Sequence, residues 1–180
     1  MTMNKISCFS QIQVEPNTLF VLDIDDTLIR FKELGKTWWK HIYSAYLIEY
    51  KGDHSQAKWA TLKIWMDKIY MYKPYPIAPF SFTDLLSKIE SEGGELILLT
   101  ARDESLRQIT EQNLKDCNII IPSDKIYFNE EKGKELKRIL QNEKNGYKKV
   151  VFVDDVEKNL LDVSNELEEI CQVKVYLFED

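Results

Sequence analysis

The chain has 180 residues, 44% of them hydrophobic and 30% charged, which is typical of one globular domain. Its net charge of -6 argues against general binding to nucleic acid or to an anionic membrane, although it still allows a local basic pocket. No apolar run has the length of a signal peptide or a membrane span, so we expect a cytoplasmic protein. A chain trimmed of an export leader would look the same. The three cysteines form no C-x-x-C motif and are expected to be reduced thiols.

The first predicted strand is Leu19–Ile24, and from Leu28 to Phe80 no strand-like run follows. Residues 36–50 and 56–72 instead place apolar residues at helical spacing, with KGDHS between them and KPYPIAP after them. We therefore expect a helical hairpin, residues 31–77, inserted into a core formed by residues 1–30 and 78–180. The many aromatic residues of the hairpin are interpreted mainly as packing groups.

After the insertion, strands and helices alternate along the chain. This alternation predicts an α/β fold, a three-layer Rossmann-like parallel sheet with helices on both faces. The predicted strands are Leu96–Leu99, Lys125–Phe128, Val150–Val153 and Val173–Phe178. The predicted helices are Phe82–Glu92, Asp103–Asp116, Glu130–Glu143 and Glu157–Ile170.

Polar side chains follow four of the predicted strands. They are Asp23 and Asp25, then Thr100, then Lys132 four residues beyond its strand, and finally Asp154 with Asp155. Ligands of an open parallel sheet bind beyond the carboxyl ends of its strands. We therefore expect these side chains to meet at one edge.

Such a cluster of carboxylates requires a cation. Two carboxylates about 4 Å apart repel by about 4 kcal/mol at an effective dielectric constant near 20. Oxygen ligands of this kind suit Mg²⁺, which keeps several waters and shares its coordination sphere with substrate phosphate. Thr100, Lys132 and the turn amides of Ala101 and Arg102 can bind an anion. This combination of groups predicts phosphoryl transfer.

Several neighbouring residues have a simpler interpretation. Asp26 is expected to be a turn or cap residue, and Asp155 can simply cap the helix that follows it. Lys134 is a rival to Lys132, although we favour Lys132. Arg102 can be a substrate contact or a solvated loop residue. Asn159 can be functional or lie on the surface.

The motifs DIDDT at 23–27, LILLT ending at Thr100, Lys132 and VVFVDD ending at Asp155 resemble, in order, the four motifs of the haloacid dehalogenase (HAD) superfamily. They frame residues 19–159. LLTARDESLRQITEQNL and EKGKEL also resemble a poorly characterised bacterial family of this superfamily, often labelled acid-phosphatase-like. The insertion lies where the C1 cap of the superfamily lies.

The resemblance implies a role for each motif residue. Asp23 would be the nucleophile that forms an aspartyl-phosphate, and Asp25 the general acid and base, with its backbone carbonyl on the metal. Thr100 would bind phosphate, and Lys132 would hold both nucleophile and phosphate. Asp154 would ligate Mg²⁺ directly, and Asp155 directly or through water. The expected activity is Mg²⁺-dependent hydrolysis of a small phosphomonoester.

Three alternatives remain at this point. A phosphotransferase of the same fold would pass the phosphoryl group to an acceptor other than water. A non-catalytic protein would keep the scaffold and bind phosphate or a partner through the aromatic hairpin. A receiver-type signalling module uses similar residues, but its acidic pair comes first and its lysine last, and it lacks an insertion of this length. The oligomeric state is not indicated.

Overall fold

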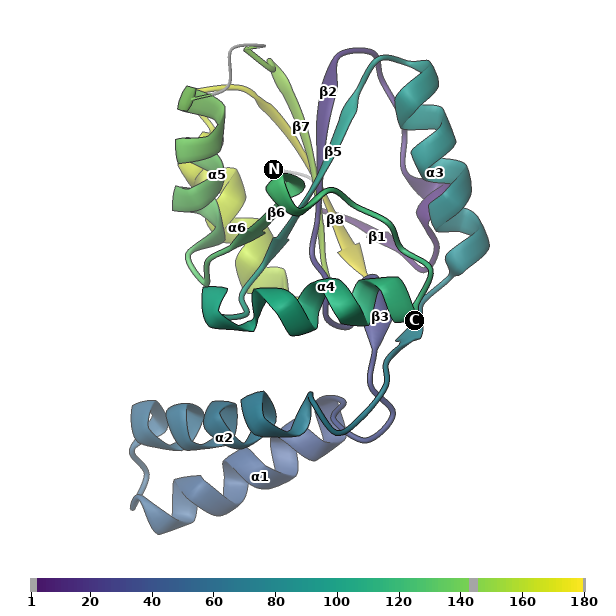
Figure 1. The fold of residues 1–180 in the computed structure, drawn as a ribbon. Helices are drawn as coiled ribbons and strands as arrows, with labels where there is room; N and C mark the ends of the chain where they lie inside the picture. The colour runs from purple at the N-terminus through teal and green to yellow at the C-terminus, as the bar shows by residue number, and fades with distance from the viewer. Residues whose placement is uncertain (1–2, 143–145, 180) are drawn as a thin grey trace. The chain divides into compact units, whose positions relative to one another are not determined.

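The computed structural model describes residues 3–142 and 146–179 (Figure 1). Its centre is a six-stranded sheet in the order β1-β8-β7-β2-β5-β6, and every neighbouring pair runs parallel. The strands are β1 Met3–Ile6, β2 Thr18–Leu22, β5 Glu95–Thr100, β6 Ile126–Phe128, β7 Lys149–Asp154 and β8 Gln172–Phe178. The five predicted strands are confirmed.

Strand β1 was not predicted from the sequence. It lies at the edge of the sheet beside β8, and of its four residues only Ile6 is buried. An edge strand with one buried side chain carries no continuous apolar run, which is the pattern that identifies strands buried on both faces.

Helices cover both faces of the sheet, which confirms the predicted α/β fold. Helices α5 (Lys132–Asn142) and α6 (Glu157–Leu167) share one core cluster with alternate strand residues such as Val21 and Phe152. Helix α3 (Pro79–Ser91) and the short helix η1 (Phe9–Gln11) cover the opposite face, where the Phe9 ring lies 5.6 Å from that of Phe82 and 5.0 Å from that of Phe178. Glu143, the last residue of a predicted helix, lies outside the described residues.

The insertion contains helices α1 (Lys36–Glu49) and α2 (His54–Lys68), so both predicted helices are present, although the second ends at Lys68 rather than at residue 72. The expectation that no strand lies between residues 28 and 80 was wrong. Strands β3 (Ile29–Arg30) and β4 (Tyr75–Pro76) pair antiparallel at the two ends of the insertion. Two-residue strands are too short to produce a periodic pattern in the sequence.

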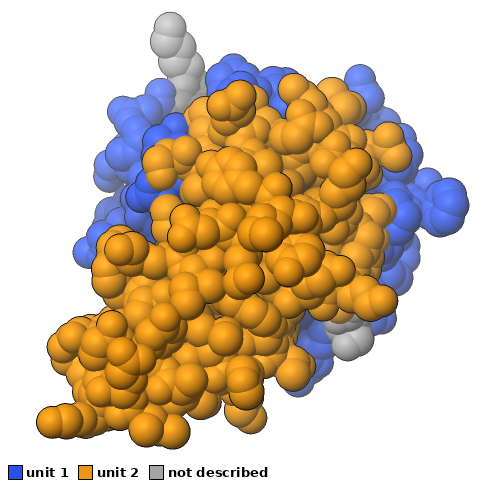
Figure 2. Space-filling model, turned by 60° about the horizontal axis from the view of Figure 1, so that its bottom comes forward, with its two compact units in different colours: residues 1–28, 77–104, 121–180 blue, residues 29–76, 105–120 orange. Residues whose placement is uncertain are grey.

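The chain divides into two compact units, coloured separately in Figure 2. Residues 1–28, 77–104 and 121–180 form the first unit, and residues 29–76 and 105–120 form the second. The second unit therefore joins the insertion to helix α4 (Arg107–Asp116) and has its own apolar core, formed by Phe31, Leu34, Trp65, Ile69 and Leu106. The remaining short helices are η2 (Glu104–Leu106) and η3 (Ser123–Lys125).

Within the described ranges, none of the helices combines the length and the apolar character that crossing a bilayer requires. Cys8, Cys117 and Cys171 are free thiols.

The start of α5 is packed against α6 at Gly133. A Cβ atom at this position would lie 2.8 Å from the carbonyl oxygen of Asp162 and 2.9 Å from Cγ of Glu166. The Gly133 amide also donates a hydrogen bond of 2.8 Å to Oδ2 of Asp162. Only glycine allows α5 to come this close to α6. The close contact fixes the position of Lys132, the first residue of α5.

We predict that Gly133→Ala lowers the free energy of unfolding by about 1–3 kcal/mol, because the added methyl group must push α5 away from α6. Lys134→Ala, on the same helical turn with an exposed side chain, is the matched control and should change stability little. Urea unfolding followed by circular dichroism measures both. Equal stability of Gly133→Ala and the wild-type protein would show that the helices are not in this close contact.

Candidate active site

Three charged side chains meet inside the first unit where β2, β7 and α5 come together. Asp23 directly follows β2, and Asp154 is the last residue of the neighbouring strand β7. The Nζ atom of Lys132 donates a hydrogen bond to Oδ1 of Asp23 and another, of 2.7 Å, to Oδ2 of Asp154. The exposed fractions are 5% for Asp23, 1% for Lys132 and 0% for Asp154. The structure thus brings together three of the residues predicted from the sequence.

The charges of this cluster are strongly coupled. Burial opposes the charged form of Lys132, but Asp23 and Asp154 overcome it and raise the pKa of Lys132. Burial raises the pKa of Asp23 well above its ordinary range; Lys132 opposes this rise, whereas Asp154, Asp155 and Asp25 add to it. One ammonium group therefore does not neutralise the carboxylates around Asp23.

The carboxylates of Asp23, Asp154 and Asp155 form a candidate metal site. Each offers an oxygen, and these oxygens lie within 4.8 Å of one another. Asp154 is held in place by the amide of Val156, which donates to Oδ1 at 2.8 Å, and by Nδ2 of Asn159, 3.0 Å from both carboxylate oxygens. The donor set consists of oxygens alone and lies beside uncompensated negative charge, so it fits Mg²⁺.

Asp25 lies outside this set of three carboxylates. The chain leaves the strand after Leu22, and Asp26 has a positive φ of 58°, which supports its interpretation as a turn residue. The carboxylate of Asp25 instead accepts two hydrogen bonds from the Arg102 guanidinium, 2.8 Å from Nε to Oδ2 and 2.7 Å from Nη2 to Oδ1. The backbone carbonyl of Asp25 as a metal ligand stays a prediction.

Arg102 was expected to be a substrate contact or a solvated loop residue. It is only 4% exposed, which is not the burial of a solvated residue, and its paired contact fixes the direction of the Asp25 carboxylate. Bidentate arginine–carboxylate pairs are geometrically specific.

The remaining predicted residues lie at the end of β5, which neighbours β2 on the side away from β7. Thr100 is buried, and its hydroxyl oxygen accepts a hydrogen bond of 3.2 Å from the amide of Arg102. Ala101 is exposed directly after the strand.

Lys134, the rival of Lys132, forms an exposed ion pair with Glu131. This difference in burial favours Lys132 as the residue of the site.

Two residues of the site were missing from the predicted set. The Thr27 hydroxyl donates to Oδ2 of Asp23 at 3.3 Å, and Asn159 holds Asp154. The signal for Thr27 was its place four residues after Asp23 in DIDDT. Asn159 lies on the first turn of α6, where it could equally have been a surface residue.

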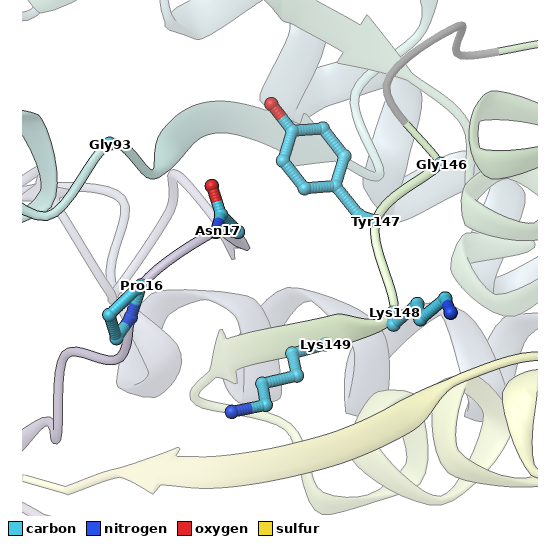
Figure 3. Close-up of a pocket in the computed structure, with 7 residues that line it drawn as sticks. All are labelled: Pro16, Asn17, Gly93, Gly146, Tyr147, Lys148 and Lys149. Carbon is cyan, nitrogen blue, oxygen red and sulfur yellow. The ribbon is translucent and has the colours of Figure 1, made fainter.

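A separate hollow of about 670 Å³ lies at the opposite edge of the sheet (Figure 3). Its lining residues lie at or just before the starts of β2, β5 and β7; they are Pro16, Asn17, Gly93, Gly146, Tyr147, Lys148 and Lys149. None of the acidic residues described above lines this hollow, so its size does not locate the chemistry.

Comparison with known proteins places this chain in a family and a fold. A model of the family described as "Protein of unknown function (DUF2608)" matches residues 2–127 and 126–179. No curated protein matches the sequence significantly. A haloacid dehalogenase-like hydrolase from Burkholderia xenovorans LB400 superposes with a TM-score of 0.54 at 14% identity, covering 90% of this chain and 82% of the other. The chain therefore has the HAD fold, as the motif order predicted.

Two further solved structures are less similar. The class C acid phosphatase from Bacillus anthracis has a TM-score of 0.48 at 19% identity, over 92% of this chain and 67% of the other. The HAD domain of the effector protein Lem4 from Legionella pneumophila has a TM-score of 0.45 at 14% identity, over 92% and 88%.

We predict that Lys132→Met destabilises the metal-free protein by about 3–5 kcal/mol, because it leaves two buried carboxylates facing each other. The pKa of Lys132 is raised in the folded state, so its stabilisation is fully present below the ordinary lysine pKa and is lost only as the pH rises through the folded value. At neutral pH the wild-type protein therefore has the full stabilisation, and Lys132→Met should show its full destabilising effect.

Lys134→Met removes the same charge at an exposed position two residues away and should change stability by less than about 0.5 kcal/mol. Chemical denaturation at pH 7 with a chelator compares the two variants. A larger loss of stability in Lys134→Met than in Lys132→Met would show that Lys132 is not the buried cation.

Proposed function

The chain belongs to the family described as proteins of unknown function (DUF2608), and from its strand-end geometry we propose that it is a Mg²⁺-dependent phosphomonoester hydrolase acting through an aspartyl-phosphate at Asp23. The observation that carries the proposal is the buried contact of Lys132 with both Asp23 and Asp154, beside the third carboxylate of Asp155. The substrate is a small phosphorylated molecule.

The charges of the site support a divalent cation and a phosphate group. Among the six charged side chains, the carboxylates of Asp23, Asp25, Asp154 and Asp155 outnumber the cations of Lys132 and Arg102 by two. The oxygens of Asp23, Asp154 and Asp155 would hold Mg²⁺, with the Asp25 carbonyl as a further proposed ligand. When bound, Mg²⁺ would neutralise phosphate charge and leave one Asp23 oxygen free.

The side chains of the site have complementary roles in this proposal. An Asp23 oxygen attacks phosphorus and the ester P–O bond breaks, while Asp25 gives a proton to the departing oxygen. Water then gives a proton to Asp25 and attacks the same phosphorus, which releases inorganic phosphate and restores Asp23. Thr100 and the amide of Ala101 bind phosphate oxygens, and Lys132 holds Asp23 beside them.

Arg102 is a positioning residue in this scheme, because its two hydrogen bonds fix the Asp25 carboxylate. Every one of these groups lies in residues 1–30 and 78–180. We propose that these segments are the catalytic core and that residues 31–77 form a cap that supplies none of the reacting groups.

We predict that Asp23→Asn lowers the rate of phosphate release by on the order of 10⁴-fold or more, because the amide cannot act as the nucleophile. The measurement is phosphate release from a panel of small phosphomonoesters, including p-nitrophenyl phosphate, in Mg²⁺. Asp26→Asn is the matched control, since it makes the same change three residues along the chain at the turn residue. A tenth of the wild-type rate in Asp23→Asn, or equal losses in the two variants, would exclude Asp23 as the nucleophile.

The metal specificity gives a second prediction. Mg²⁺ should support turnover, whereas Ca²⁺ should bind and inhibit it, because Ca²⁺ accepts more ligands and can take both Asp23 oxygens. Steady-state rates in each metal after chelator treatment measure this difference. Equal rates in Mg²⁺ and Ca²⁺ would contradict the proposed coordination. Turnover only when an alcohol acceptor is added would identify a phosphotransferase.

A further inference from the structure

The charge of the chain is divided between two regions of opposite sign. Residues 31–77 contain eight lysines and four acidic residues, a net charge of +4, whereas the whole chain carries -6. The remaining residues therefore carry -10. The overall charge, which argues against binding to an anionic surface, conceals a basic segment.

The aromatic residues are divided in the same way. All four tryptophans of the chain lie in residues 31–77, and so do six of its nine tyrosines. Trp38, Trp39 and Trp65 take part in the core of the second unit, so packing accounts for them. Packing does not account for the aromatic and aliphatic side chains that remain exposed.

Several large apolar side chains of residues 31–77 are exposed. Helix α1, whose residues are all described, contains no buried residue. Ile48 is 82% exposed, Trp59 59%, and Met71 71%.

On α2 an exposed tryptophan and an exposed lysine share one face. Its buried residues Ala57, Thr61 and Trp65 follow each other at intervals of four. Trp59 lies two positions from Ala57 and so on the other side of the helix, and the exposed Lys63 follows it one turn later. This face therefore combines an aromatic ring with a cation, and the exposed carboxylate of Asp67 follows one turn further on.

We propose that the hairpin of residues 31–77 binds the surface of a bilayer that contains anionic phospholipid. Trp59 and Ile48 enter the boundary between headgroups and acyl chains, and the lysines extend to the lipid phosphates. Lysine, tryptophan and tyrosine are residues that proteins often place where they contact a membrane interface. The charge of the segment is complementary to such a surface.

Two features of the hairpin favour lipid over nucleic acid. Residues 31–77 contain no arginine, the residue that proteins favour for planar, bidentate contacts with phosphates and bases. Ile48 and Met71 are aliphatic and offer hydrocarbon contact rather than a stacking face. Lysine stems can also lie along apolar surface while their ammonium groups reach the phosphates.

The location of the tryptophans makes the proposal directly measurable, because intrinsic tryptophan fluorescence reports on the hairpin alone. The full chain is titrated with phosphatidylcholine vesicles with and without phosphatidylglycerol, at low and high salt, and co-sedimentation is measured in parallel. With vesicles that contain phosphatidylglycerol we expect a blue shift of the fluorescence and pelleting of the protein. Both effects should weaken at high salt and in vesicles without phosphatidylglycerol. No binding to phosphatidylglycerol vesicles at low salt, or equal binding to both kinds of vesicle, would overturn the proposal.

Two pairs of charge-reversal variants distinguish the contribution of the hairpin to vesicle binding from that of the overall charge. Lys40→Glu/Lys63→Glu changes two exposed lysines of α1 and α2 and should weaken partitioning by roughly tenfold or more. Lys88→Glu/Lys148→Glu makes the same charge change at exposed lysines outside the hairpin and should leave partitioning almost unchanged. Trp59→Ser should reduce the blue shift without changing any charge. Circular dichroism checks the fold of each variant.

Other occupants of this surface give different results. If the two pairs of lysine variants lost vesicle binding equally, overall charge would explain the binding and the proposal would be overturned. Binding to single-stranded RNA without binding to vesicles would assign the hairpin to nucleic acid. A concentration-dependent dimer that Lys40→Glu/Lys63→Glu dissociates, again without vesicle binding, would assign it to a second copy of the chain. Either of these results would overturn the proposal.

Discussion

The ammonium group of Lys132 lies between the carboxylates of Asp23 and Asp154 in the interior of the protein, and the active site depends on this contact. Burying a charge costs several kcal/mol unless a partner and further hydrogen bonds compensate for it. The three groups come from α5, β2 and β7, so they remain compensated only while these elements keep their relative positions. Gly133 and its contacts with Asp162 contribute to this, because they fix the start of the helix that carries Lys132.

The same cluster is the physical reason for proposing that the site binds a further cation. Lys132 satisfies one oxygen each of Asp23 and Asp154, yet the pKa of Asp23 is still raised, since burial and the neighbouring carboxylates both oppose its charge. A site of this kind is poorly balanced by itself and becomes balanced when a divalent cation enters. Charge is also unevenly distributed over the whole chain, with an acidic core around the chemistry and a basic, aromatic insertion. We propose that the acidic core carries the chemistry and that the basic insertion determines where in the cell the protein binds.

The parts of this structure that the sequence predicted are those with strong periodic or positional signals. Buried parallel strands produce continuous apolar runs, and the positions after these runs predicted the cluster of Asp23, Lys132 and Asp154 that the structure brings together. Strand β1 and the β3–β4 pair were not predicted, because an edge strand and two-residue strands leave no such pattern. The contact between Arg102 and Asp25 joins residues 77 positions apart, and no local pattern reports a partner at that distance. Burial favours Lys132 over Lys134, and burial depends on packing that only the folded chain has.

The central claim is that Asp23 carries the phosphoryl group during turnover, and chemical trapping tests it most directly. Borohydride reduces an aspartyl-phosphate to homoserine, so the enzyme is quenched during turnover of a phosphomonoester in Mg²⁺, reduced and digested for mass spectrometry. The account predicts homoserine at position 23, and none when substrate or Mg²⁺ is omitted. Homoserine at position 25, 154 or 155 would contradict it, and so would unmodified Asp23 in an enzyme that is releasing phosphate under conditions that trap a control acyl phosphate.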